Sequence, residues 1–166
     1  MDNIKKNFLL NKLFEEKKLK KNSNFKYPLL SNGYAKKDLI EATKTLISRN
    51  LTMGKKTIKF EKYFAKKIGA KYSLMVNSGS SANLLAFFCI TNVLKKNKVE
   101  KGSECIIPGV CWSTTLWPIL QSGLKPVFVD VDINNFCIDY SSIIKKVTKK
   151  TKVIILVNVL GNCPEI

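Results

Sequence analysis

The residues of this chain best suited to chemistry are three small ones, Gly79, Ser80 and Ser81, which follow a short apolar run. A glycine lets a ligand approach the backbone closely, and serine hydroxyls can donate hydrogen bonds. An apolar run long enough for a helix begins at Ala82. Free backbone N–H groups and the helix dipole would then point at one place, which suits a phosphate group. A second interpretation stays open, in which Ser78 or Ser80 only caps the helix.

The tryptophan, aspartate, histidine and cysteine content of the chain limits which other functional sites it could contain. Trp112 could stack on a flat ligand or be an ordinary core aromatic, and Asp130 and Asp132 resemble an acid/base pair. The 166 residues include no histidine, which excludes a Ser-His or Cys-His nucleophile pair within them. The five cysteines contain no C-x-x-C pair, so we predict no metal site and a reducing compartment.

The net charge of +17 could indicate a nucleic-acid partner. Arg49 is the only arginine, however, and arginine carries most bidentate recognition of bases and phosphates. The spread of lysines along the chain favours a solvated lysine surface and no specific nucleic-acid partner. No apolar run approaches the roughly 18 residues of a membrane span. The start of the chain lacks a signal-peptide pattern, so we expect a cytoplasmic protein without a membrane partner.

Several elements must position the small residues. A buried strand over residues 72–76 is expected before them, and a helix over residues 82–94 after them. Further strands and helices are expected to alternate: a strand at 105–108, a helix at 113–121, a strand at 126–132, a helix at 141–150 and a strand at 152–157. This alternation predicts an α/β fold with a mostly parallel sheet covered by helices on both faces. Asn77, residues 108–112, residues 130–132 and Asn158 would then meet at the carboxyl edge of the sheet.

The first part of the chain is predicted to be helical. Residues 1–25 read as an amphipathic helix and linker, with the helix docking on the body or on a partner. Residues 27–30 read as extended because a proline follows Tyr27. Helices over residues 36–49 and 58–68 follow, joined by a loop at residues 51–54.

Four segments occur together in an order that resembles a known family. They are residues 60–65 (FEKYFA), 76–82 (VNSGSSA), 126–132 (PVFVDVD) and 151–154 (TKVI). Over residues 26–166 the chain resembles the DegT/DnrJ/StrS family of pyridoxal-phosphate-dependent nucleotide-sugar aminotransferases and dehydratases. The resemblance implies a fold-type-I transferase that works as a homodimer, with its sites at the subunit interface.

The same resemblance implies roles for individual residues. Gly79, Ser80 and Ser81 would hold the phosphate of pyridoxal or pyridoxamine 5′-phosphate, and Trp112 would lie against the pyridine ring. Asp130 and Asp132 would be structural residues at a strand end. The loop at residues 51–54 matches a segment near the substrate, a nucleotide-linked keto sugar.

Further details resemble the sugar 3-dehydratase branch of the family. They are residues 80–84, the loop at 95–102, Trp112 with Thr114 and Thr115, residues 118–124 and residues 160–162. In that branch a CDP-linked 4-keto-6-deoxyhexose loses its 3-hydroxyl, in surface polysaccharide or deoxysugar biosynthesis. Transamination of a keto sugar remains the alternative.

The chain departs from the family pattern at its end. Ile166 precedes the positions of the family's aspartate that pairs with the pyridine nitrogen and of its catalytic lysine or histidine. We therefore assign no catalytic residue, and we expect residues 26–166 to be the N-terminal part of an incomplete large domain that is inactive alone. The alternative is a non-catalytic truncated domain or a basic interaction module.

Overall fold

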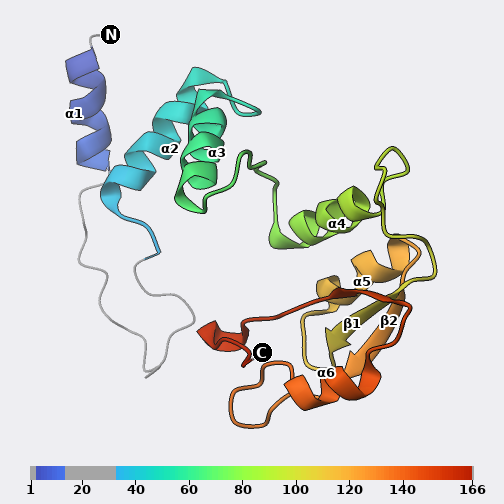
Figure 1. The fold of residues 1–166 in the computed structure, drawn as a ribbon. Helices are drawn as coiled ribbons and strands as arrows, with labels where there is room; N and C mark the ends of the chain where they lie inside the picture. Colours follow the sequence, from blue (N-terminus) through green and yellow to red (C-terminus); the bar gives the residue numbers. More distant parts are fainter. Residues whose placement is uncertain (1–2, 14–32, 166) are drawn as a thin grey trace. The chain divides into compact units, whose positions relative to one another are not determined.

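The computed structural model describes residues 3–13 and 33–165, in two compact units that divide between Met75 and Val76 (Figure 1). The predicted linker and the extended segment at residues 27–30 lie outside the described residues. Among the helices of the described ranges, none is both long and apolar enough to cross a membrane.

The first unit contains three helices: α1 (Asn3–Leu13), α2 (Lys36–Ser48) and α3 (Lys55–Lys67). A helix forms in each of the three predicted regions, although α3 begins three residues before the expected start. The amphipathic character expected of the first helix stays a prediction. Ile4 and Phe8 of α1 are exposed, and docking of this helix stays a prediction. Arg49 ends α2 in the left-handed conformation with φ 60°.

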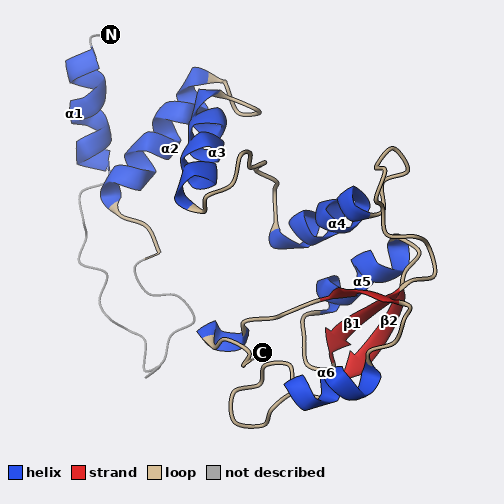
Figure 2. Ribbon diagram, viewed as in Figure 1, coloured by secondary structure: helices blue, strands red, loops and turns tan. Residues whose placement is uncertain are grey.

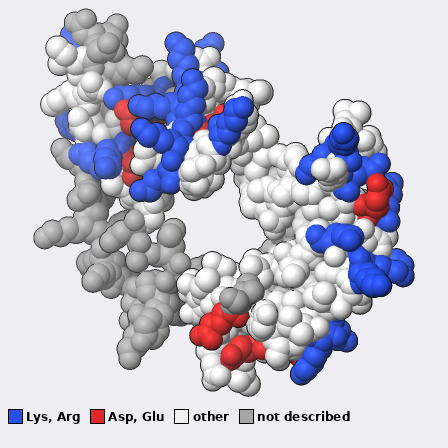
Figure 3. All heavy atoms as spheres, viewed as in Figure 1, with Lys and Arg blue, Asp and Glu red and all other residues white. Residues whose placement is uncertain are grey.

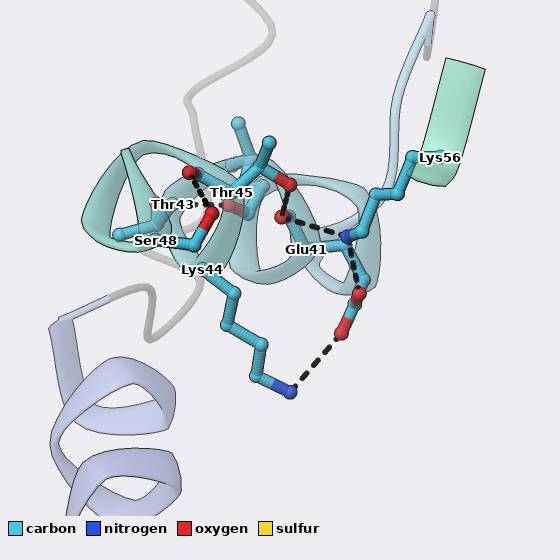
Figure 4. Close-up of polar contacts among 7 residues, drawn as sticks. Glu41, Thr43, Lys44, Thr45, Ser48 and Lys56 are labelled. Atoms are coloured by element: carbon cyan, nitrogen blue, oxygen red, sulfur yellow. Dashed lines mark hydrogen bonds and ion pairs between the residues drawn. The ribbon is translucent and has the colours of Figure 1, made fainter. Parts of the chain in front are cut away.

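A small ion cluster joins α2 to α3 (Figure 4). The Glu41 carboxylate accepts hydrogen bonds from Lys44 Nζ at 3.0 Å and Lys56 Nζ at 2.6 Å. Lys56 Nζ also donates to the backbone oxygen of Glu41 at 3.1 Å. These hydrogen bonds and the two positive charges lower the pKa of Glu41 to about 2. The carboxylate is therefore ionised at neutral pH and fixes the start of α3 beside α2.

The predicted strand over residues 72–76 is wrong. The segment is extended, but it pairs with no strand in the described part of the chain, and Tyr72 and Leu74 are exposed. Glu61 of α3 holds it instead, accepting a hydrogen bond from the Met75 N–H at 2.9 Å, while Ser73 Oγ donates to the Glu61 backbone oxygen at 2.8 Å. A strand forms only where a neighbouring strand satisfies its backbone groups, and local sequence does not report that neighbour.

The second unit is built on a parallel sheet in the order β2-β1-β3 (Figure 2). Its strands are β1 (Glu104–Pro108), β2 (Lys125–Val129) and β3 (Thr151–Ile154). The predicted parallel α/β arrangement is confirmed. Both outer strands end three residues earlier than expected. After β2, Val131 forms an isolated antiparallel bridge with Ile138.

Helices cover both faces of this sheet, as predicted. On one face α4 (Gly79–Ile90) and α5 (Ser113–Gln121) form a core with β1 through Phe87, Ile107 and Ile119. On the other face α6 (Tyr140–Lys146) packs Ile143 against Ile106. The alternation of Ile106 and Ile107 between faces follows from the two-residue period of a strand.

Two helices end earlier than predicted, each at an identifiable contact. At the end of α4, the Thr91 hydroxyl donates to the Phe87 oxygen at 2.8 Å, and α4 stops at Ile90. After α6, Thr148 Oγ1 donates to Glu104 Oε2 at 2.6 Å and draws the chain towards β1. The helix α5 keeps its predicted bounds with Pro118 inside it.

Candidate functional site

Ser78 caps the helix α4. Its backbone is extended, with φ −158° and ψ 161°, and its Oγ accepts a hydrogen bond from the Ser81 N–H at 3.1 Å. The Ala82 N–H donates to the Ser78 backbone oxygen at 3.0 Å. Of the two interpretations of this segment, capping by Ser78 is confirmed.

The cap leaves part of the helix N-terminus free. Within the described ranges, the backbone N–H groups of Gly79 and Ser80 have no hydrogen-bond acceptor. These two donors lie at the positive end of the helix dipole. A Cβ built on Gly79 would meet no atom within 4 Å, so the space at this turn is open. Capping and anion binding are therefore compatible, because they use different N–H groups.

A hydrogen bond between side chains connects this turn to α5. Ser80 Oγ donates to Thr114 Oγ1 at 2.9 Å, across 34 residues of sequence. Beside this pair a shallow groove of about 250 Å³ lies between the two helices. Its lining residues are Ser80, Ser81, Leu84, Thr114, Trp117, Pro118 and Gln121. The groove brings two of the three predicted phosphate ligands together with residues of α5 to which the sequence analysis assigned no role in binding.

Trp112 lies at the start of α5, is 73% exposed and belongs to neither buried cluster of the described residues. Its stacking against a flat ligand stays a prediction. Trp112 does not line the groove, whereas Trp117 does. An exposed indole next to a helix N-terminus remains free to lie against a flat ring. Thr114, Trp117 and Gln121 share one face of α5 at helical spacing, and that spacing was the signal available in the sequence.

The carboxyl ends of β1 and β2 meet at one edge, as expected. Pro108 lies opposite Val129 in the sheet, and the Gly109 N–H donates to the Val129 oxygen at 2.8 Å. Beyond β2, Asp132 Oδ1 accepts a hydrogen bond from the Asn134 N–H at 2.7 Å. That contact organises a turn, in keeping with a structural role for this aspartate. No described hydrogen bond brings Asn77 to this edge, and Asn158 makes only backbone turn contacts.

A second concave surface lies in the first unit. A pocket of about 390 Å³ includes Leu51 and Gly54 of the predicted substrate loop among its lining residues. Glu41, Lys44 and Lys56 also line it and pair with one another, and Lys55 adds a further positive charge. Lys and Arg gather over the α2–α3 part of the surface (Figure 3). The start of α3 in this pocket also lacks a side-chain cap, but a Cβ on Gly54 would lie 3.2 Å from the Asn50 backbone oxygen, so this turn does not have the open space found at Gly79.

Comparison with known proteins gives consistent results. Residues 33–166 match the model of the DegT/DnrJ/EryC1/StrS aminotransferase family. The chain is 44% identical over 136 residues to the GDP-4-keto-6-deoxy-D-mannose 3-dehydratase of Escherichia coli O55:H7, covering 82% of this chain and 35% of the relative. The corresponding dehydratase of Yersinia pseudotuberculosis is 43% identical, with 82% of this chain and 34% of the relative covered.

The fold agrees with these sequence matches. An E. coli GDP-4-keto-6-deoxy-D-mannose 3-dehydratase structure with bound hydrated pyridoxal phosphate superposes with a TM-score of 0.75 and 44% identity. The match covers 81% of this chain and 34% of that one. The predicted fold-type-I, α/β architecture is thereby confirmed. The chain spans about a third of the length of the curated relatives it matches.

Proposed function

The chain belongs to the DegT/DnrJ/EryC1/StrS aminotransferase family, and we propose that it supplies the phosphate-binding part of a pyridoxal-phosphate-dependent enzyme that acts on a nucleotide-linked keto sugar. The observation that carries the proposal is the start of α4, where Gly79 and Ser80 present free N–H groups to open space. A phosphate at this place would meet both N–H groups and the positive end of the helix dipole.

The side chains around this turn fit the cofactor. Ser80 and Ser81 add hydroxyl donors, and Gly79 has no side chain to obstruct the phosphate. Trp112 supplies a flat apolar surface that would orient the ring and keep water from it. The cofactor, once bound, acts as an electron sink for bond breaking next to the carbon that it holds. We assign no catalytic residue to the described ranges.

The proposed reaction is 3-dehydration of a nucleotide-linked 4-keto-6-deoxy sugar. Two relatives at 44% and 43% identity carry the name GDP-4-keto-6-deoxy-D-mannose 3-dehydratase, which favours GDP over the CDP expected from the sequence. Transamination of a keto sugar stays the alternative, because the family includes aminotransferases. We also propose that the enzyme is a homodimer, that it works in the cytoplasm and that it contributes to surface polysaccharide or deoxysugar synthesis.

Phosphate-dependent binding of the vitamin B6 ring tests this proposal. Pyridoxine 5′-phosphate is the preferred probe, because it lacks the aldehyde through which pyridoxal phosphate reacts with lysine amines. The chain should bind it much more tightly than pyridoxine in an isothermal titration. Equal affinity for the two compounds contradicts the proposal.

Two serine substitutions locate the binding. Ser80→Ala should weaken the binding of pyridoxine 5′-phosphate about 10- to 100-fold, the effect of losing a hydrogen bond to a charged group. Ser142→Ala is the control, because Ser142 lies in the first turn of a different helix, α6, where its backbone N–H donates to Asp139 and is retained in the variant. The same loss in both variants would place the binding elsewhere.

A further inference from the structure

The helices that carry Ser80 and Thr114 are fixed by one core. Phe87 of α4 and Ile119 of α5 are buried together against Ile107 of β1. The hydroxyls of Ser80 and Thr114 therefore meet at 2.9 Å on two elements that cannot easily separate. Functional groups held on packed helices keep their geometry better than groups on loops.

Either hydroxyl of this pair can be the hydrogen-bond donor. Each hydroxyl has one proton to donate and two lone pairs to accept with. Ser80 donates to Thr114 in the structure, and within the described ranges neither hydroxyl has another acceptor. Hydroxyl protons rotate freely, so the pair can also form with Thr114 as the donor. In that arrangement the proton of Ser80 is released for an anion.

We infer that Thr114 is a positioning residue for the cofactor phosphate, which acts by donating to Ser80 and turning the Ser80 hydroxyl proton towards the phosphate. The inference rests on the proposed function, since it requires a phosphate at the start of α4. It assigns no direct contact between Thr114 and the phosphate. A chain of hydrogen bonds in one direction is also stronger than its separate members, because each bond polarises the next.

The identity of residue 114 fits this role. A threonine is β-branched, so its side chain has few rotamers and its hydroxyl is held in place at little entropic cost. Thr114 is half-buried on the wall of the α4–α5 groove, where water competes less for its hydroxyl. Thr115, the next residue, is also half-buried but makes no side-chain hydrogen bond within the described ranges. The neighbouring threonine is thus a matched control.

The test is a titration of the full chain and its variants with pyridoxine 5′-phosphate. Thr114→Val keeps the shape of the side chain but loses the hydroxyl, and it should weaken binding about 3- to 10-fold. Thr114→Ser restores the hydroxyl and should bind within about 2-fold of the unchanged chain. Thr115→Val should bind like the unchanged chain. Equal losses in the two valine variants overturn the inference.

A double-mutant cycle separates positioning from a general structural effect. In the Ser80→Ala background, Thr114→Val should change affinity by less than about 2-fold, because Thr114 acts through Ser80. If Thr114→Val weakens binding as much in the Ser80→Ala background as in the unchanged chain, the inference is overturned. It is also overturned if Thr114→Val alone keeps full affinity while Ser80→Ala alone loses it. Those two results leave the proposed function intact. Failure of the unchanged chain to prefer the phosphorylated probe overturns the proposed function and the inference together.

Discussion

The side-chain oxygen of Ser78 accepts a hydrogen bond from the backbone N–H of Ser81 at 3.1 Å. This contact divides the first turn of α4 between two tasks. The N–H of Ser81 belongs to the cap, whereas the N–H groups of Gly79 and Ser80 remain free for a ligand. Stability and ligand binding at this turn can therefore be changed separately.

Substitutions of Ser78 test that separation. Ser78→Ala should lower the free energy of unfolding by about 1 kcal/mol, the usual effect of losing a helix cap. Ser78→Asp should retain the cap, because aspartate is a good capping residue, but its negative charge should repel a phosphate at Gly79 and Ser80. Denaturant unfolding and titration with pyridoxine 5′-phosphate measure the two effects. Tight phosphate binding by Ser78→Asp contradicts the proposed location.

The ion cluster of Glu41 should give stability a measurable pH dependence. The folded-state pKa of Glu41 is about 2, below its ordinary value of 4.5. The stabilisation is therefore complete above pH 4.5 and is lost as the pH falls towards 2. Glu41→Gln should flatten this part of the curve of melting temperature against pH. Because the group is exposed, 1 M salt should shrink the difference between the two proteins. A difference at pH 2 as large as that at neutral pH contradicts the assignment.

Glu61 should hold the segment before α4 through its contact with Met75. Its Oε1 accepts the Met75 N–H at 2.9 Å, so Glu61→Ala should accelerate hydrogen exchange at that amide. Glu61→Gln retains a side-chain oxygen and serves as the control, with exchange close to that of the unchanged chain. Equal exchange in Glu61→Ala and the unchanged chain would show that this bond does not protect the segment.

Two glycines with positive φ allow the cost of a strained backbone to be separated from the cost of a Cβ that crowds a neighbouring side chain. Gly102 has φ 81° and open space around it, whereas a Cβ on Gly123, at φ 79°, would lie 3.1 Å from Lys101 Cγ. Each change to alanine should lower stability by about 1–2 kcal/mol from the left-handed backbone alone. Gly123→Ala should lose more, and Lys101→Ala should recover the excess. Equal losses at both glycines would show that Lys101 simply moves aside.

Local patterns in the sequence predicted much of the second unit. The bounds of α5 were predicted correctly because Gly123 follows that helix closely and its apolar face repeats at helical spacing. The strand β1 was recognised as a short apolar run that ends at Pro108. The alternation of these elements was sufficient for the parallel sheet.

The features that sequence reasoning missed depend on distant parts of the chain. Residues 72–76 have the composition of a strand, but Glu61 holds the segment and no described strand pairs with it. Thr114 became part of the candidate site only because α4 and α5 pack on the same face of the sheet. Nothing within a few residues of Thr114 could have revealed that contact.

The most direct measurement of the central claim follows the backbone amides of α4 by nuclear magnetic resonance during addition of pyridoxine 5′-phosphate. The Gly79 and Ser80 N–H signals should move downfield and saturate, because these groups acquire a phosphate acceptor. The Ser81 N–H should move less, since it already donates to Ser78. Pyridoxine without phosphate should move none of the three. Unchanged Gly79 and Ser80 signals, with shifts only at lysine-rich parts of the chain, would contradict a phosphate site at the start of α4.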